Sequence, residues 1–229
     1  ILNTQDNVDM INELKGLFHD SANVAKQNRE GILGRTAGFD FYENTLLPSH
    51  TVGAGSGYLV NGANQTGSTL AVSTGTGALN KGDIITIAGV YRVHPETKQN
   101  TGKLQQFVVT ANYAGGAGNI SISPAITPTG AGQNVTASPA NGAAITVAGT
   151  ASTAHGLSLA FQKDAFVFAT ADLVKPNGVD FAAREVFDGI SLRIVRDYDI
   201  NNDNMPCRID VLYGFKAVRP QLACRLAAN

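Results

Sequence analysis

The sequence predicts a fold of the α+β class that consists mainly of β-strands. Short runs in which apolar and polar residues alternate recur along the 229-residue chain, and Gly and Pro separate them, as is typical of strands joined by turns. The middle of the chain, residues 53–162, holds only six of the 35 charged side chains (17 basic plus 18 acidic). The first 31 residues differ, because their apolar residues recur at helical spacing.

Two helices are predicted near the N-terminus. The stretch NVDMINELKGLF, residues 7–18, places four apolar residues on one helical face: Val8, Ile11, Leu14 and Phe18. The stretch SANVAKQNREG, residues 21–31, begins with Ser21 as a candidate N-cap and ends with Gly31 just past the last turn. Both helices belong to the charged N-terminal flank of the chain.

The charge-poor middle is predicted to form many short strands. It is rich in Gly, Ala, Ser, Thr and Asn, and its alternating runs are STLAV, DIITIAGV, KLQQFVVT, NISIS and AITVAG. Short strands at close spacing, separated by Gly and Pro turns, are typical of a barrel or a sandwich. The sequence therefore predicts an antiparallel β module over residues 53–162.

The C-terminal flank is predicted to contain further strands. The run AFVFATA is followed by a mixed segment around DFAAREVFDG, and then by two alternating stretches, SLRIVRDY and CRIDVLYGFKAV. Alternation predicts that the last strand is half-buried, so that one of the neighbours Val211 and Leu212 lies in a core and the other faces solvent. The flanks, residues 1–52 and 163–229, are each too short for a comfortable domain. We predict that they form one discontinuous domain around the inserted module at 53–162.

Composition excludes several classes of protein. The net charge is −1, so the chain lacks the basic surface that supplies most affinity for nucleic acid, and we predict no specific nucleic-acid binding. No apolar run approaches the roughly 20 residues of a membrane-spanning helix, and the chain does not open on a secretion signal, so we predict a protein without a membrane partner. Cys207 and Cys224 could form a disulfide, but without a secretion signal reduced, packed thiols are the favoured prediction.

An Asx-rich segment, residues 197–210, is a candidate calcium loop. It carries oxygen-bearing side chains at alternate positions, as an EF-hand loop does. In the register that starts at Asp197, Arg208 stands where a closing carboxylate is needed, and in the register that starts at Asp199, Asn204 replaces the required glycine. The flanking strands also replace the helices of that motif. We therefore predict a turn between two strands and no metal site.

No constellation in the sequence predicts an enzyme. The four histidines, His19, His50, His94 and His155, are scattered without metal-ligand spacing and are predicted to be solvated or in turns. His94, Glu96 and Lys98 share one polar loop, for which a hairpin tip is a better interpretation than a catalytic cluster. The glycine-rich run GAGSGYLVNG lacks the following helix of a phosphate loop. We predict no catalytic residue, no cofactor and no metal.

Three stretches resemble the major coat (capsid) proteins of tailed bacteriophages and prophages, of the P-22 coat type. They are AGFDFYENTLLPSHTVG (37–53), KGDIITIAGVYRVHPETKQNTGKLQQFVV (81–109) and DGISLRIVRDYDINNDNMPCRIDVLYGFKAVRPQLACRL (188–226). The resemblance implies an HK-97-like capsid fold, with apical and peripheral domain portions and an inserted antiparallel β-barrel where the charge-poor middle lies. The family's N-terminal arm, extended loop and spine helix have no counterpart here, which implies the C-terminal part of a longer coat protein.

The resemblance implies the structural subunit of an icosahedral bacteriophage capsid, self-assembling into the shell that encloses the genome. Its implied partners are further copies of the chain, a scaffolding protein and a portal, and its implied locations are the virion and, during assembly, the host cytoplasm. Two alternatives remain open. One is a β-rich carbohydrate-binding module of a phage tail or adhesin, which would need exposed aromatic residues, and the other is a hydrolase that uses His94 and Glu96.

Overall fold

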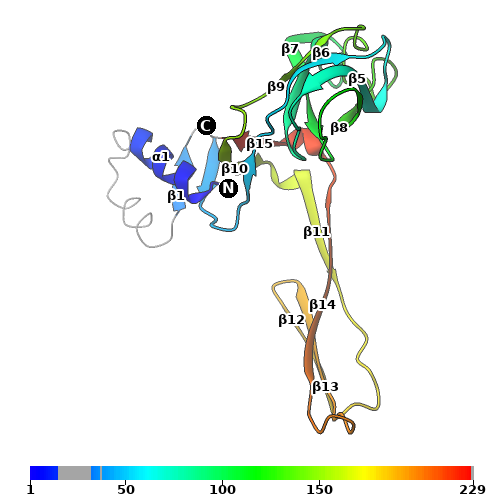
Figure 1. Cartoon of the computed structure of the whole chain (residues 1–229). Coiled ribbons are helices and arrows are strands. Elements are labelled where there is room, and N and C mark those ends of the chain that lie inside the picture. The colour runs from blue at the N-terminus through cyan, green and yellow to red at the C-terminus, as the bar shows by residue number, and fades with distance from the viewer. Residues whose placement is uncertain (15–31, 37, 228–229) are drawn as a thin grey trace. The chain divides into compact units, whose positions relative to one another are not determined.

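The computed structural model describes residues 1–14, 32–36 and 38–227 of the chain. These residues form two compact units, which are described separately below. Unit 1 comprises Ile1–Ser158 with the last residues of the chain, and unit 2 comprises Leu159–Leu226. Strands predominate in both units, as Figure 1 shows, which confirms the mainly β prediction.

The N-terminal helix α1 spans Thr4–Leu14. Asn3 caps it, because its side-chain Oδ1 accepts a hydrogen bond from the backbone N–H of Asp6 at 2.8 Å. The observed helix begins earlier than the predicted helix at 7–18, and the last part of that prediction lies outside the described residues. The second predicted helix, at 21–31, also lies outside them. Two short strands, β1 (Ile32–Thr36) and β2 (Phe39–Tyr42), then form an antiparallel pair.

Six strands of unit 1 close into a β-barrel. Their order around the barrel is β4-β5-β8-β7-β6-β9, and the pairing of β4 with β9 completes the ring. The strands are β4 (Ser56–Val60), β5 (Gly67–Thr76), β6 (Ile84–Val93), β7 (Asn100–Val109), β8 (Gly118–Ile126) and β9 (Ala144–Val147). Five of them fall on the predicted alternating runs. The sixth, β4, forms within the glycine-rich run GAGSGYLVNG.

The barrel interior is the main hydrophobic core of the described structure. Alternate residues of each strand point inward, as period-two geometry requires, and the loop residues Leu79 and Val135 join them. In β6 the alternation shifts after Ile87, so that Val90 rather than Gly89 is buried. Gly89 has φ +80°, a backbone conformation that glycine adopts without steric cost. The irregular pairing of β6 with β7 lies between Thr86 and Tyr91, next to this glycine.

A small three-stranded sheet has the order β15-β10-β3. In unit 1, β3 (Ser49–Thr51) pairs with the first residues of β10 (Ala154–Phe161). In the sequence, β3 precedes the barrel strands and β10 follows them. The pairing continues one step toward the barrel, where the Val52 N–H donates to the Thr153 carbonyl oxygen at 3.1 Å. The two chain segments that connect to the barrel therefore leave it side by side.

Unit 2 is built on one antiparallel four-stranded sheet with the order β11-β14-β13-β12. Its strands are β11 (Phe166–Ala171), β12 (Phe181–Phe187), β13 (Ile190–Arg196) and β14 (Cys207–Ala217), followed by β15 (Ala223–Ala227). One half of β14 pairs with β11 and the other half pairs with β13. The predicted strands over 165–171, 191–198 and 207–218 are confirmed, and the mixed segment around 180–189 is a strand as well.

The prediction that the last strand is half-buried is wrong for this chain. Val211 is 41% exposed and Leu212 is 47% exposed, although they point to opposite faces of β14. The reason is that the sheet of unit 2 forms a single layer. Among its described residues only Ala165 and Ser191 are buried, so neither face is covered by a core of the unit's own.

Candidate functional site

One face of the unit 2 sheet carries large apolar side chains on all four strands. The residue pairs Phe168 with Phe215, Leu192 with Val211, and Phe187 with Ile190 lie opposite each other in register, so each pair points to the same face. Alternation then assigns further residues to that face. We call it the apolar sheet face, and it comprises Phe166, Phe168, Phe181, Phe187, Ile190, Leu192, Ile194, Ile209, Val211, Tyr213 and Phe215.

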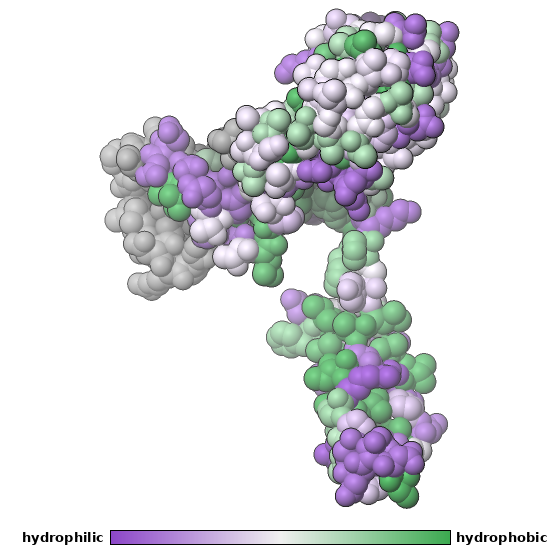
Figure 2. Space-filling view, in the orientation of Figure 1, coloured by the Kyte–Doolittle hydropathy of each residue, from purple (hydrophilic) through white to green (hydrophobic). Residues whose placement is uncertain are grey.

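Nearly all of these side chains are exposed. Phe187 is 83% exposed and Phe215 is 80% exposed, and of the eleven residues only Ile194 falls below the exposed class. The ring centroid of Tyr213 lies 6.0 Å from that of Phe168 and 6.4 Å from that of Phe215, so three aromatic rings form a row. Figure 2 shows hydrophobic residues gathered over this sheet. Burying one such side chain contributes about 1.5–3 kcal/mol, so an uncovered face of this extent is typical of a surface that another protein segment covers.

The opposite face of the same sheet carries ion pairs. Arg193 and Asp210 lie opposite each other on β13 and β14, and Arg193 Nη2 is 2.5 Å from Asp210 Oδ2. Arg208 Nε is 2.9 Å from the other carboxylate oxygen, Oδ1. The hydrogen bond from Arg193 is the main cause that lowers the pKa of Asp210 from its ordinary value. Large apolar side chains therefore predominate on the first face, although the same registers also place Glu185 and Arg196 there. The opposite face combines these ion pairs with the exposed side chains of Val167, Val186 and Leu212.

The Asx-rich segment forms the turn between β13 and β14, as predicted. The Asp199 N–H donates to the Asn204 carbonyl oxygen at 2.9 Å. The two carboxylate oxygens of Asp199 accept hydrogen bonds from the Asn201 N–H and the Asn202 side chain, and the bond from Asn202 is the main cause of a lowered Asp199 pKa. Tyr198 Oη donates to Asp203 Oδ1 at 2.8 Å, which raises the pKa of Tyr198. The hydrogen bonds that the Asp199 and Asp203 carboxylates accept thus stabilise the turn.

The described residues contain no group of three His, Cys, Asp or Glu side chains that could hold a metal ion. Cys207 and Cys224 are free thiols, but both are exposed, so the prediction that they are packed is wrong. Cys207 lies on β14, whose sheet has no covering layer, and Cys224 lies on β15. A hollow of about 260 Å³ in unit 1 is lined mainly by glycine, valine and alanine, and its only side-chain polar groups are the hydroxyls of Ser56 and Thr146.

The loop with His94, Glu96 and Lys98 is the hairpin tip between β6 and β7. The ring nitrogen Nδ1 of His94 accepts hydrogen bonds from the backbone N–H groups of Glu96 and Thr97, both at 3.3 Å. Lys98 Nζ donates to the carbonyl oxygens of Ala131 and Gln133. The imidazole therefore holds the backbone of its own hairpin tip, the ammonium group binds the backbone of the loop at 131–133, and Glu96 is exposed to solvent.

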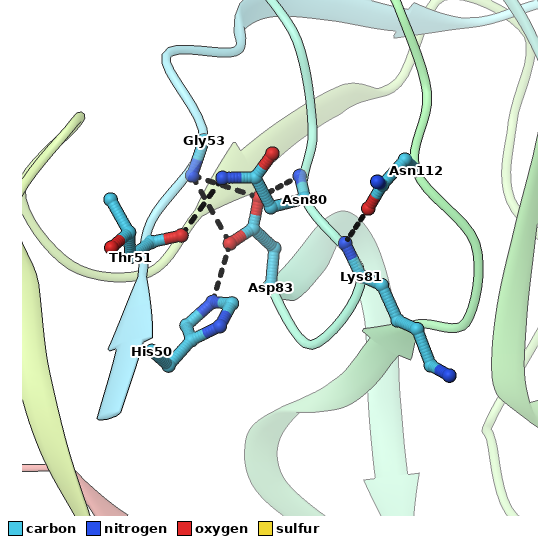
Figure 3. Close-up of polar contacts among 7 residues, drawn as sticks. All are labelled: His50, Thr51, Gly53, Asn80, Lys81, Asp83 and Asn112. Carbon is cyan, nitrogen blue, oxygen red and sulfur yellow. Dashed lines mark hydrogen bonds and ion pairs between the residues drawn. The ribbon is translucent and has the colours of Figure 1, made fainter. Parts of the chain in front are cut away.

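A polar contact that the sequence did not predict lies beside the barrel. The carboxylate of Asp83 is 0% exposed and the His50 ring is 10% exposed, with His50 Nε2 at 2.8 Å from Asp83 Oδ1 (Figure 3). His155 lies opposite His50 in register and packs edge-on against it, at 5.5 Å between ring centroids. The prediction that His50 is solvated or in a turn is therefore wrong. Asp83 is 33 residues away in the sequence, and no local pattern links the two.

The aromatic residues that a sugar-binding module would need are mostly unavailable in the middle segment. Tyr58 and Phe107 lie fully buried in the barrel core, and Tyr113 packs against it. Burial and the neighbouring Tyr113 raise the pKa of Tyr58. Tyr91 and Phe161 are the remaining aromatics of this segment, and each is little more than one-third exposed. The large exposed aromatic surface lies instead on the sheet of unit 2.

These features describe a structural protein with a wide surface for association. The chain belongs to the coat protein family described as "P22 coat protein - gene protein 5", whose model matches residues 25–226. Membership of a phage coat protein family implies that the protein is a structural part of the virion. In the described part of the chain, no helix is long and apolar enough to span a membrane.

Comparison with solved structures finds the "CUS-3 coat protein I-domain". That structure is 30% identical to the matched part, the match covers 40% of this chain and 94% of that chain, and the TM-score is 0.31. No curated protein matches the chain.

Proposed function

We propose that this protein is the major capsid subunit of a tailed bacteriophage or prophage, which self-assembles into an icosahedral shell of HK-97-like architecture around the genome. Membership of the coat protein family supports the structural role. The apolar sheet face carries the rest of the proposal, because a sheet with ten exposed large apolar side chains on one face is far more stable once that face is covered.

The chemistry of the sheet suits repeated association. Its apolar face supplies non-directional attraction, and the Arg193 and Asp210 pair on the other face is already satisfied within the chain. Many copies that each bury the same surface form a closed shell when the rotation between neighbours closes. The net charge of −1 adds little repulsion between copies.

The proposed domain arrangement follows the sequence prediction. Residues 1–52 and 163–229 form the discontinuous apical and peripheral domain portions, and residues 53–162 form the inserted barrel domain. The hydrogen bond between Val52 and Thr153 supports this arrangement, because an inserted domain leaves and re-enters its host at neighbouring positions. A scaffolding protein and a portal are further proposed partners, and assembly is proposed to occur in the host cytoplasm.

Electron microscopy tests this function directly. The gene that encodes this chain is expressed together with its neighbouring genes, and the lysate is examined for closed shells. A Phe168→Ser variant is compared with Val167→Ser, which changes the adjacent exposed residue on the opposite face of β11. We expect shells from the unchanged gene and from Val167→Ser, and at least about tenfold fewer from Phe168→Ser. Equal shell yields from the two variants, or no shells from the unchanged gene, would contradict the proposal.

A further inference from the structure

The Asp83 carboxylate occupies an unusual position between the barrel and the strands that lead to it. Asp83 belongs to the loop at residues 78–83, between β5 and β6, and its carboxylate is 0% exposed. Oδ2 accepts hydrogen bonds from the Asn80 N–H at 2.7 Å and from the Gly53 N–H at 3.1 Å. Oδ1 lies 2.8 Å from His50 Nε2 and 3.2 Å from the Gly53 nitrogen. A buried carboxylate is stable only when such donors surround it.

The same loop is tied to the barrel on its other side. The Lys81 N–H donates to Asn112 Oδ1 at 2.7 Å, and the Gly82 N–H donates to the Val109 carbonyl oxygen at 2.8 Å. Toward β3, Asn80 Nδ2 donates to the Thr51 carbonyl oxygen at 2.9 Å (Figure 3). The loop therefore bridges two bodies, the barrel that contains Asn112 and the strand pair that contains His50.

Gly53 lies in close contact with the loop at residues 78–83. A Cβ atom at this position would lie 2.3 Å from the Ala78 carbonyl oxygen and 2.7 Å from Asp83 Oδ2. Both distances are too short for real contacts, so any larger residue would push the loop away. The absence of a side chain at residue 53 is what allows the carboxylate to reach the backbone of the connecting segment.

We propose that the Asp83 contact with His50 and Gly53 acts as a lock, which holds the barrel in place against the strand pair β3 and β10. The barrel is covalently joined to that pair by the neck, which we define as residues 52–55 and 148–153. Backbone hydrogen bonds between Val52 and the segment 152–153 hold the neck, and the lock lies directly beside them. Without the lock, the neck opens locally while the barrel core stays folded, because the core is built from the barrel's own interior residues.

Amide hydrogen exchange, measured by NMR on the full chain, tests the lock. The informative amides are those of Val52 and Ser152, whose N–H groups donate to the neck carbonyl oxygens of Thr153 and Val52 rather than to Asp83. We expect Asp83→Ala to accelerate their exchange by about tenfold or more, since the variant leaves buried donors unpaired. Interior barrel amides, such as that of Ile87, are expected to stay within about twofold of the unchanged protein.

Further variants separate the lock from a general loss of stability. His50→Phe keeps a ring against His155 but removes the N–H donor, and Gly53→Ala introduces the clash with the loop; both should show the same selective opening of the neck. Asn112→Ala cuts a hydrogen bond of the same loop on the barrel side and should leave the neck amides unchanged. If Asp83→Ala fails to fold, His50→Phe and Gly53→Ala decide the question. Unchanged neck amides in those variants, or equal acceleration of neck and barrel amides, would overturn the lock.

Discussion

Single residues of the same type have opposite roles in the two units, and phenylalanine shows this most clearly. Phe107 is fully buried in the barrel core, whereas Phe215 on the apolar sheet face is 80% exposed. Phe107→Ala is expected to lower the free energy of unfolding of the barrel by about 3–5 kcal/mol, because it leaves a cavity. Phe215→Ala is expected to change the stability of the unassembled chain by no more than about 0.5 kcal/mol. Urea unfolding of both variants measures the difference, and a large cost for Phe215→Ala would mean that this face is already covered.

The lowered pKa of Asp210 makes the stability of unit 2 depend on pH. A carboxyl group whose pKa is lower in the folded state stabilises that state above its unfolded pKa, here near the ordinary 3.8, and the contribution disappears as the pH falls through the folded value. We therefore expect unit 2 to lose more stability between about pH 5 and pH 2 than the same unit with Asp210→Asn. Urea unfolding followed by the NMR signals of β13 and β14 measures this, and parallel pH profiles would contradict the assigned role of Arg193.

Sequence reasoning predicted few of the individual contacts. The Asx-rich pattern around Asp199 and Asp203 does predict the turn, because Asx side chains bond the nearby backbone and that pattern is local. The contact between His50 and Asp83 was missed, because it depends on how the loop at residues 78–83 folds back onto β3. A local pattern contains no information about such a long-range contact.

At the scale of elements, the turn at 197–206 gives a clear test for a bound ion. Its best oxygen ligands already accept hydrogen bonds from Asn201, Asn202 and Tyr198. We expect the thermal stability of the chain to be unchanged by millimolar calcium, both in the unchanged protein and in the variant that combines Asp199→Ala, Asn201→Ala and Asp203→Ala. A bound ion at a hundredfold excess over its dissociation constant would add about 2.7 kcal/mol, so a rise in melting temperature limited to the unchanged protein would reveal a site.

Strand positions could be predicted from the sequence, whereas burial could be predicted only in part. The alternating runs from STLAV to AITVAG gave five barrel strands, since a closed barrel supplies its own interior for every inward residue. For β14 the alternation predicts the strand, but it does not predict whether either face of the strand is buried. Period-two patterning distinguishes two faces, but it does not show what covers either one. The apolar sheet face therefore cannot be predicted from any one of its segments, because it depends on the register in which β11, β12, β13 and β14 pair.

At the scale of the whole molecule, the barrel should be separable from the rest of the chain. All fifteen residues of its core cluster lie between Tyr58 and Ile145. We expect a fragment that spans residues 53–162 to fold alone, with a dispersed amide NMR spectrum, because its hydrophobic core is internal and the segments that enter and leave the barrel are hydrogen-bonded to each other at Val52 and Thr153. A collapsed, random-coil spectrum would contradict the proposed domain arrangement without bearing on the coat protein family.

The central claim is that the apolar sheet face is covered in an assembled shell. The most direct test is a cryo-EM reconstruction of particles purified after expression of the gene with its neighbours, at a resolution that shows side chains. The account predicts closed icosahedral shells in which Phe168, Tyr213 and Phe215 are packed against other protein segments. Shells in which these three side chains face solvent, or a homogeneous soluble monomer under the same expression conditions, would contradict it.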